Sequence, residues 1–214
     1  MGNGLILHHD LNRYKKDEGV DDMQSKKLVK LIILALLGTI SFLLFFLNFP
    51  IPFLPTPYLK VDFGDVPALI AALIFSPLAG VMVLAIKNFL YFVIGGGDPV
   101  GVWASFFAAS MFILPVAFLY HKYKGIKSIV IGLVAGTIIM AVGMSVLNYL
   151  VILPIYAWFM GMEEMKIESV KWAAVVFGIL PFNIIKGIMV GILFVPLFIK
   201  MRSWIESKQT QLQI

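Results

Sequence analysis

Five polar side chains of this sequence lie inside long apolar segments, where a polar group is expensive to keep unless it has a function or a partner. They are Lys87, Asn88, Asn148, Asn183 and Lys186. Asn183 and Lys186 are three residues apart, so they lie on the same face of a helix. Amides offer both donors and acceptors, whereas a lysine only donates. Such a set can recognise a planar ring edged with carbonyl groups and ring nitrogens, so the pattern indicates a binding site.

Each of these residues also has a structural alternative. Asparagines can hydrogen-bond neighbouring membrane helices, and Lys87 can bond to helix carbonyls or extend toward the membrane surface. An internal ion pair is disfavoured for both lysines, because no Asp or Glu lies within any expected span. At about 1.5 Å per residue along the expected helices, Asn148, Asn183 and Lys186 fall in the outer half of the membrane. We predict that these three bind a ligand, and Asn88 is a further candidate.

The composition is typical of a membrane protein. The chain is 60% hydrophobic and 14% charged, and its mean hydropathy is +0.95. Its 214 residues have room for about six spans of ~20 residues, so we expect an all-α membrane protein, a six-transmembrane-helix bundle. The expected spans are Leu28–Phe49, Val66–Phe75, Leu78–Ile94, Val100–Tyr120, Ile129–Leu153 and Lys171–Ile199. The second is too short to cross ~30 Å alone, so it is either tilted and buried or partly broken.

Most lysines and arginines lie on one side of the expected spans, in the two tails and in the loop after the fourth span. The other side mixes a few lysines with acidic residues such as Asp62 and Asp65. Cytoplasmic segments carry such a basic excess, so we expect both termini in the cytoplasm of a multi-pass protein in the cell membrane. The same segregation argues against nucleic acid as a partner, despite the net charge of +5. We expect a disordered cytoplasmic tail at residues 1–22, the transmembrane binding domain at residues 23–205 and a second cytoplasmic tail at residues 206–214.

The segment between Asn48 and Asp65 is rich in proline, which forbids a regular helix there. Its prolines are Pro50, Pro52, Pro55 and Pro57. The segment is otherwise largely apolar, so we do not expect it to be exposed to water. We expect an ordered loop that forms a lid over the binding site, with Tyr58 and Leu59 near the ligand.

Other chemistries are excluded by what the sequence lacks. It has no Cys, which removes disulfides and thiol catalysis, and no GxxxxGK[ST] motif for hydrolysing ATP. Its spans hold no catalytic or metal-binding constellation, so we expect no enzyme, no metal and no cofactor. An ion-coupled secondary transporter of a small aromatic metabolite is the alternative function, but it usually needs a buried carboxylate or inverted repeats with broken helices. A membrane enzyme is a third class, disfavoured by the missing catalytic cluster.

Three stretches of the chain resemble a known family. They are LNFPIPFLPTPYLKVDFGDVPALIAALIFSPLAGVMVLAIKNFLYFVIGG, MSVLNYLVILPIYAWF and GILPFNIIKG. Together they make residues 24–205 similar to the riboflavin-specific substrate-binding (S) component of energy-coupling factor (ECF) transporters. The resemblance implies a six-helix bundle with a high-affinity riboflavin site near the outer face, covered by the loop after the first helix. Riboflavin is then a transported ligand and not a cofactor.

The resemblance also implies which residues meet the ligand and the partners. The family's ligand contacts fall here on Leu59, Asn148, Asn183 and Lys186. Small residues on the family's first helix dock a transmembrane coupling subunit that carries two cytoplasmic ATPases. Ala35 and Thr39 form such a small-xxx-small face in this chain, with Thr39 standing where the family often has alanine. The implied function is riboflavin capture for ATP-driven import in a bacterial cell membrane.

Overall fold

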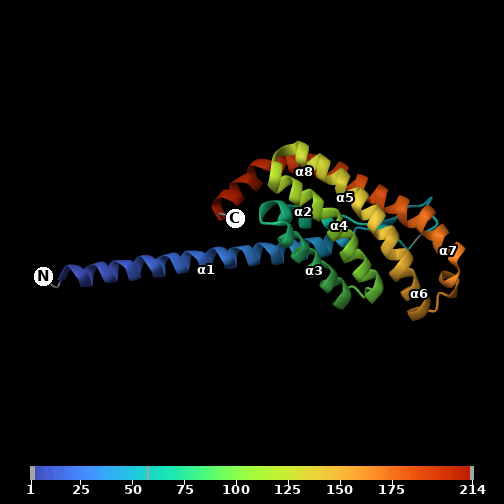
Figure 1. Cartoon of the computed structure of the whole chain (residues 1–214), viewed down its shortest axis with the longest axis horizontal. Helices are drawn as coiled ribbons and strands as arrows, with labels where there is room; N and C mark the ends of the chain where they lie inside the picture. Colours follow the sequence, from blue (N-terminus) through green and yellow to red (C-terminus); the bar gives the residue numbers. More distant parts are fainter. Residues whose placement is uncertain (1–2, 57, 213–214) are drawn as a thin grey trace.

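The computed structural model describes the backbone of residues 3–56 and 58–212, and the side chains of residues 23–56 and 58–211. Its α-helices are α1 (Asn3–Phe45), α2 (Asp65–Ile74), α3 (Pro77–Val93), α4 (Pro99–Tyr123), α5 (Gly125–Leu147), α6 (Leu153–Phe159), α7 (Glu168–Ala173) and α8 (Leu180–Leu212). Two π-helical segments, η1 (Asn148–Ile152) and η3 (Ala174–Ile179), and a 3-10 turn, η2 (Glu163–Lys166), lie between them. Figure 1 shows the helices gathered into one bundle, from which the first half of α1 extends away.

Within the described residues, four helical segments are long and apolar enough to cross a membrane. They are Met23–Phe45, Pro99–Tyr123, Gly125–Phe159 and Glu168–Gln211. The last two are continuous, because η1 joins α5 to α6 and η3 joins α7 to α8 without a break. The helices α2 and α3 are apolar but shorter. The expected all-α class is therefore confirmed, and four of the expected spans are long enough to cross by themselves.

The short helix α2 lies at the centre of the bundle. All of its residues are buried, and it contacts α1, α3, α4 and α8. After its first residue the helix is apolar on every side, which suits a helix enclosed by others. Of the two alternatives for the second expected span, the structure thus supports burial. Ser76 caps the next helix by accepting a hydrogen bond from the amide of Ala79, and Pro77 starts α3, as the Ser-Pro pair predicts.

Glycines allow α4 and α5 to approach closely. A Cβ atom at Gly136 would overlap the carbonyl oxygen of Phe112, and one at Gly132 would lie 2.7 Å from the Cα of Val116. Membrane helices commonly pack through such small residues, because close approach increases van der Waals contact. The contact fixes the position of α5, whose continuation η1 begins at Asn148.

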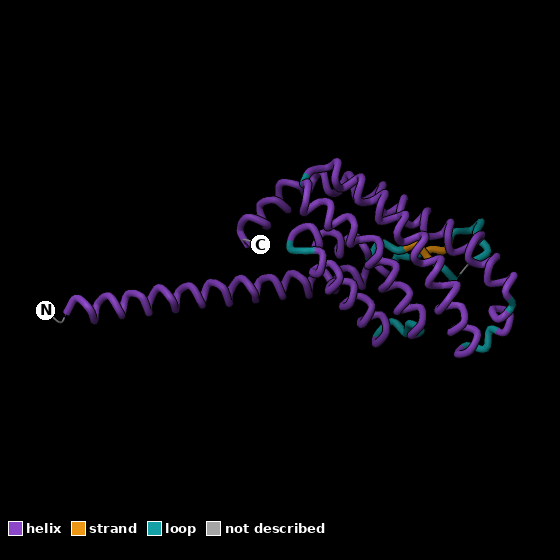
Figure 2. The backbone as a smooth tube through the Cα atoms, in the orientation of Figure 1, coloured by secondary structure: helices purple, strands orange, loops and turns teal. Residues whose placement is uncertain are grey.

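The proline-rich segment is not helical, as predicted, and it folds back as a small hairpin. The strand β1 (Phe49–Pro50) pairs antiparallel with β2 (Lys60–Val61), and Figure 2 shows these strands in orange among the helices. Ile51 and Val61 pack in a buried cluster with Phe182 of α8. The apolar side chains of the segment thus hold it against the bundle.

Both ends of the chain are more helical than the sequence indicates. The helix α1 begins at Asn3, where we expected disorder over residues 1–22, and α8 continues to Leu212. Once a helix has nucleated, each further residue adds a hydrogen bond, and neither extension contains a proline to stop it. Residues 1–2 and the side chains of residues 3–22 lie outside the described part of the chain. The start of the folded domain at residue 23 therefore stays a prediction.

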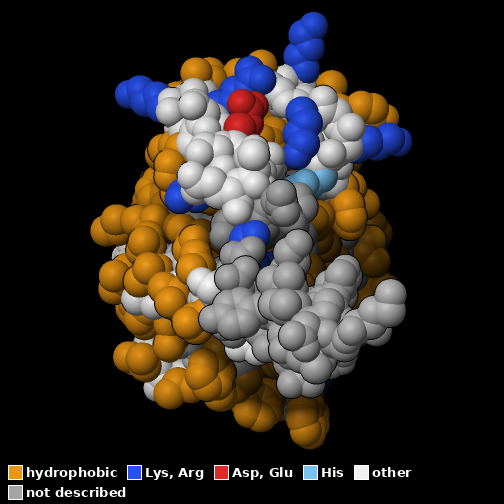
Figure 3. Space-filling view, turned by 90° about the vertical axis from the view of Figure 1, so that its left-hand side faces the viewer, with side chains coloured by type: hydrophobic (Ala, Val, Ile, Leu, Met, Phe, Trp, Pro, Cys, Tyr) orange, Lys and Arg blue, Asp and Glu red, His pale blue; other side chains and the backbone are white. Residues whose placement is uncertain are grey.

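The surface separates basic and apolar side chains. Figure 3 shows lysines and arginines spread over one end of the molecule, above flanks covered with apolar side chains. Large apolar residues such as Leu36 of α1, Phe118 of α4 and Ile131 of α5 are well exposed. An apolar belt beside a basic end is the pattern of a helical membrane protein.

Candidate ligand-binding site

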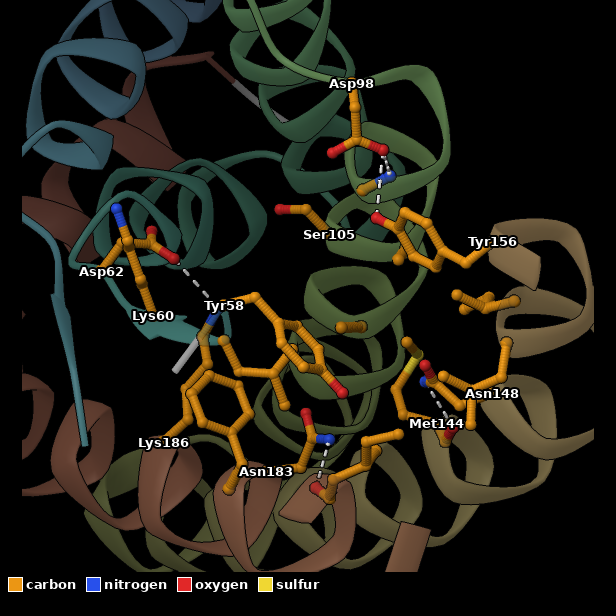
Figure 4. A pocket seen from close by; sticks show the side chains of 18 of the residues that line it. Tyr58, Lys60, Asp62, Asp98, Ser105, Met144, Asn148, Tyr156, Asn183 and Lys186 are labelled. Carbon is orange, nitrogen blue, oxygen red and sulfur yellow. Dashed lines mark hydrogen bonds and ion pairs between the residues drawn. The ribbon is translucent and has the colours of Figure 1, made fainter. Parts of the chain in front are cut away.

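A cavity of about 470 Å³ lies among the helices, a size typical of small-molecule sites. Its walls come from the β1–β2 loop and from α1, α3, α4, α5, η1, α6, η3 and α8 (Figure 4). The polar side chains that border it are those of Asn48, Tyr58, Lys60, Asp62, Tyr91, Asp98, Ser105, Asn148, Tyr156, Asn183 and Lys186. Leu59 borders it as well. Four of the candidate ligand-binding residues thus meet on one cavity, and their contact with a ligand stays a prediction.

Asn148 and Asn183 are held in the same way. The side-chain amide of Asn148 donates to the carbonyl oxygen of Met144 at 2.7 Å, and that of Asn183 donates to the carbonyl oxygen of Ile179 at 2.8 Å. Each bond reaches one helical turn back and restricts the side chain to one orientation. A carboxamide has two hydrogens and an oxygen, so each residue keeps an N–H group and its oxygen for a ligand.

One π-helical segment begins at one asparagine, and another ends one helical turn before the other asparagine. The segment η1 begins at Asn148, and η3 ends at Ile179, four residues before Asn183. Such turns are frequent at functional sites, because the extra residue shifts the following side chains out of the regular helical register. Thr56 of the loop meets η3 at Gly178, where a Cβ atom would overlap the threonine methyl group. Gly178 therefore allows the loop to lie directly against the helix that carries Asn183.

Asn88 does not join the other candidates. Its side-chain amide donates to Leu84 at 2.8 Å, which is the same local pattern, but Asn88 does not border the cavity. Its oxygen is buried without a hydrogen-bond partner among the described residues. The geometry gives no support to a ligand contact by Asn88.

Internal ion pairs are present, so the expectation that disfavoured them was wrong. The ammonium group of Lys186 lies 3.1 Å from Asp62 and 3.0 Å from Asp65. The ammonium group of Lys87 lies 2.8 Å from Asp65 and 3.9 Å from Asp62. These four side chains are at most 6% exposed. We call Asp62, Asp65, Lys87 and Lys186 the ion cluster; its two positive and two negative charges balance.

The two aspartates were expected outside the membrane, because they precede the second expected span. The hairpin instead folds back, and α2 starts at Asp65, so both carboxylates are carried into the bundle. Buried charges are strongly destabilising unless they are paired. Two lysines within apolar spans therefore require carboxylates nearby, and Asp62 and Asp65 lie just before the start of the shortest expected span. That charge balance was the signal in the sequence from which the ion cluster could have been found.

A second polar contact lies across the cavity from Asn183 (Figure 4). Asp98 accepts hydrogen bonds from the backbone amide of Gly101 at 2.7 Å and from the hydroxyl of Tyr156 at 3.0 Å. It therefore caps α4 and ties that helix to α6. Neither residue was predicted from the sequence as a site candidate. The Asp98-Pro99 pair marks a helix start in the sequence, but nothing in the sequence links it to a tyrosine on α6.

The cavity combines apolar surface with both donors and acceptors. Met144, Ile152 and Phe182 supply apolar walls beside the two amides. Partial burial raises the pKa of the Tyr58 phenol above its usual value, so its hydroxyl stays protonated at neutral pH and able to donate. Among the side chains that the structure describes, no group of three histidines or carboxylates could hold a metal ion. The arrangement suits a flat organic ligand with a polar edge.

The fold and the cavity define a helical membrane protein with a site for a small molecule among its helices. A family model described as "ECF transporter, substrate-specific component" matches residues 29–198. The chain belongs to this family, whose members are components of transporters and not enzymes.

Relatives and a solved structure agree with this membership. The chain is 49% identical to "Riboflavin transporter FmnP" of Bacillus subtilis (strain 168), over 86% of this chain and 97% of that protein. It is 41% identical to "Riboflavin transporter RibU" of Staphylococcus aureus (strain TCH60), over 86% and 95% of the two chains. The fold is similar to that in "Structure and mechanism of the S component of a bacterial ECF transporter", with a TM-score of 0.71 and 41% identity, covering 83% of this chain and 98% of that chain.

Proposed function

We propose that this chain binds riboflavin with high affinity at the outer face of the bacterial cell membrane and presents it to a separate ATP-driven module for import. The observation that carries the proposal is the meeting of Asn148, Asn183 and Lys186 on one cavity. Membership of the family and the names of the two relatives support the identity of the ligand.

The groups on the cavity suit the chemistry of riboflavin. One edge of its flat ring system carries carbonyl groups and ring nitrogens, which the amides of Asn148 and Asn183 can pair with. The ammonium group of Lys186 has three hydrogens; it donates one to Asp62 and forms an ion pair with Asp65, which leaves a hydrogen for a ring acceptor. Leu59 packs with the cluster of apolar residues beside the cavity and can cover the ring.

The membrane placement that fits this function has six crossings and cytoplasmic termini. The four long segments supply four crossings, and α2 and α3 supply two shorter ones. Asp98 and Met162, in the α3–α4 and α6–α7 connections, border the cavity. The basic residues Lys122 and Lys124 lie at the α4–α5 connection, at the other end of α4. With the basic end in the cytoplasm, the cavity lies toward the outer side.

The partners in this proposal are a transmembrane coupling subunit and two cytoplasmic ATPases. Ala35 and Thr39 are exposed on α1, so internal packing does not use this small-residue face. The hydroxyl of Thr39 donates to the carbonyl oxygen of Ala35 at 2.9 Å. Because its polar group is satisfied within the helix, Thr39 can take the place of an alanine in a contact between membrane helices.

Riboflavin titration tests the binding function. Riboflavin fluorescence should be quenched at near-stoichiometric amounts of the purified protein, and protein isolated from cells should show flavin absorbance. Fluorescence that is unchanged by excess protein would exclude riboflavin as the ligand.

The ion-coupled alternative gains one feature, because buried carboxylates are a usual requirement of such transporters. Both Asp62 and Asp65 are already paired with lysines, however, which leaves neither poised to exchange a cation. Concentrative uptake by this chain alone, in energised vesicles without the ATPases, would favour the alternative. Uptake that requires the ATPases would favour the capture function.

A further inference from the structure

The ion cluster connects three helices to the non-helical segment between Asn48 and Asp65, and Asp62 is its member in that segment. Asp65 lies in α2, Lys87 in α3 and Lys186 in α8, whereas Asp62 follows the strand β2. We propose that Asp62 is a positioning residue of the binding site: it holds the β1–β2 loop over the cavity and orients the ammonium group of Lys186. This inference rests on the proposed riboflavin site.

The contacts of Asp62 join the loop to the bundle. One carboxylate oxygen receives a hydrogen bond from Lys186 at 3.1 Å. The other accepts from the backbone amide of Gly64 at 2.9 Å, which fixes the turn that leads into α2. Asp62 is 2% exposed, and its neighbour Val61 is fully buried. Leu59 precedes Asp62 by three residues, so the pair that anchors Asp62 also limits the movement of Leu59 at the cavity.

The members of the ion cluster divide into two pairs. Asp62 and Lys186 border the cavity, whereas Asp65 and Lys87 do not. Either aspartate contributes one negative charge, but only the bond to Asp62 crosses from the loop to α8. Neutralising Asp62 therefore upsets the charge balance and releases the loop, whereas neutralising Asp65 upsets the balance alone. This difference separates a positioning role from a general contribution to stability.

Lys186 is affected as well. While Asp62 and Asp65 hold its ammonium group from two directions, the remaining N–H has a defined direction. Without the charge of Asp62, the ammonium group is drawn toward Asp65 alone. A ligand contact through Lys186 then loses its fixed geometry, and a weakened contact of this kind acts mainly on the dissociation rate of the ligand.

The test compares Asp62→Asn with Asp65→Asn as its matched control. A spin label at Phe53→Cys reports loop mobility, because Phe53 is 75% exposed in the loop and the chain contains no other cysteine. Riboflavin release, followed by fluorescence, reports the site. Asp62→Asn should raise the label's mobility and speed release by about tenfold or more. Asp65→Asn should leave the label's mobility as in the parent protein, although it also speeds release because it removes one of the two carboxylates that hold Lys186.

A neutral double variant guards against misfolding. Asp62→Asn with Lys87→Met removes one charge of each sign and leaves Lys186 opposite Asp65, so it should fold and still have a mobile loop. Equal loosening by Asp62→Asn and Asp65→Asn would overturn the proposal, as would a rigid loop in the double variant. Failure of the double variant to fold, when Asp65→Asn folds, would overturn it too, because Asp62 would then be a requirement of the bundle.

The spin-label measurement does not depend on riboflavin. If the parent protein fails to quench riboflavin fluorescence, the proposed function is rejected, while the mobility of the label at residue 53 still tests the positioning role of Asp62.

Discussion

The side chains of Asn183 and Asn88 make the same hydrogen bond in different surroundings, so one serves as a control for the other. Each amide donates to the carbonyl oxygen four residues earlier, but only Asn183 borders the cavity. We expect Asn183→Leu to weaken riboflavin binding by about 1–3 kcal/mol, the usual loss when a buried polar partner is removed. Fluorescence titration measures this loss.

The control variant is Asn88→Leu. The oxygen of Asn88 is buried without a partner among the described residues, and an apolar side chain of similar size in its place is close to neutral. Its affinity for riboflavin should match that of the parent protein. Equal losses of affinity in the two variants would place Asn88 in the site. They would contradict the conclusion that Asn183 contacts the ligand and Asn88 does not.

Lys186→Met should affect stability as well as binding. The change leaves Asp62 and Asp65 facing Lys87 alone, and an uncompensated buried charge is destabilising by about 3–5 kcal/mol. Adding Asp65→Asn restores neutrality, so the double variant should recover thermal stability and still bind riboflavin weakly. Thermal unfolding in detergent and fluorescence titration separate the two effects. Recovery of full affinity by the double variant would remove Lys186 from the ligand contacts.

At the level of residues, the sequence indicated the polar groups but not their partners. Asn148, Asn183 and Lys186 stand out because each interrupts an apolar run, and the structure brings them to one cavity. The partners of Lys186 are far from it in sequence, and only the folding of the loop brings Asp62 within 3.1 Å. Apolar periodicity carries no information about such a tertiary contact. The requirement that buried charges balance does indicate that carboxylates lie near Lys186.

The packing of α5 against α4 depends on glycines at which the two helices approach closely. A Cβ atom at Gly136 would overlap the carbonyl oxygen of Phe112, which belongs to the backbone and cannot move independently of α4. We expect Gly136→Ala to destabilise the protein by about 1–3 kcal/mol, as overpacking does in a well-packed core. Thermal unfolding, with and without riboflavin, measures the change.

Gly191 of α8 provides the matched control. A Cβ atom there would meet only the side chain of Leu133, at 3.8 Å, which is an ordinary contact. Because alanine also favours the helix over glycine, Gly191→Ala should be neutral or slightly stabilising. A loss of stability as large as that of Gly136→Ala would show that both glycines matter for the helix itself and not for the α4–α5 contact.

The helices were easier to predict than the hairpin, for a physical reason. Predominantly apolar segments of 17 residues or more indicate α3, α4 and α5 whatever lies beside them. The strands β1 and β2 have two residues each, too few for a local pattern, and they are held by packing with Phe182 of α8. The sequence could therefore predict that the segment is not a helix, because of its prolines, but not the hairpin it forms.

The sequence has no motif for hydrolysing ATP, so in the proposed capture function the energy for uptake against a gradient comes from a partner. The exposed face of α1 at Ala35 and Thr39 is free of internal packing. Small residues allow two membrane helices to approach closely, whereas a bulky side chain holds them apart. This face is therefore the proposed contact with the coupling subunit. Neither Ala35 nor Thr39 borders the cavity, so docking and ligand binding use different residues.

Replacing either Ala35 or Thr39 with Trp should abolish riboflavin uptake by cells that contain the full transporter, while riboflavin binding by the isolated chain stays close to that of the parent protein. Ile131→Trp is the matched control, because Ile131 is an exposed apolar residue of α5 on a different helix; it should leave both uptake and binding unchanged. Uptake that survives both α1 replacements would place the coupling subunit on another face. A specific contact at α1 predicts that bulk on α1 abolishes uptake and that bulk on α5 does not. Loss of uptake in all three variants would therefore mean that added bulk anywhere on the membrane-facing surface impairs the protein.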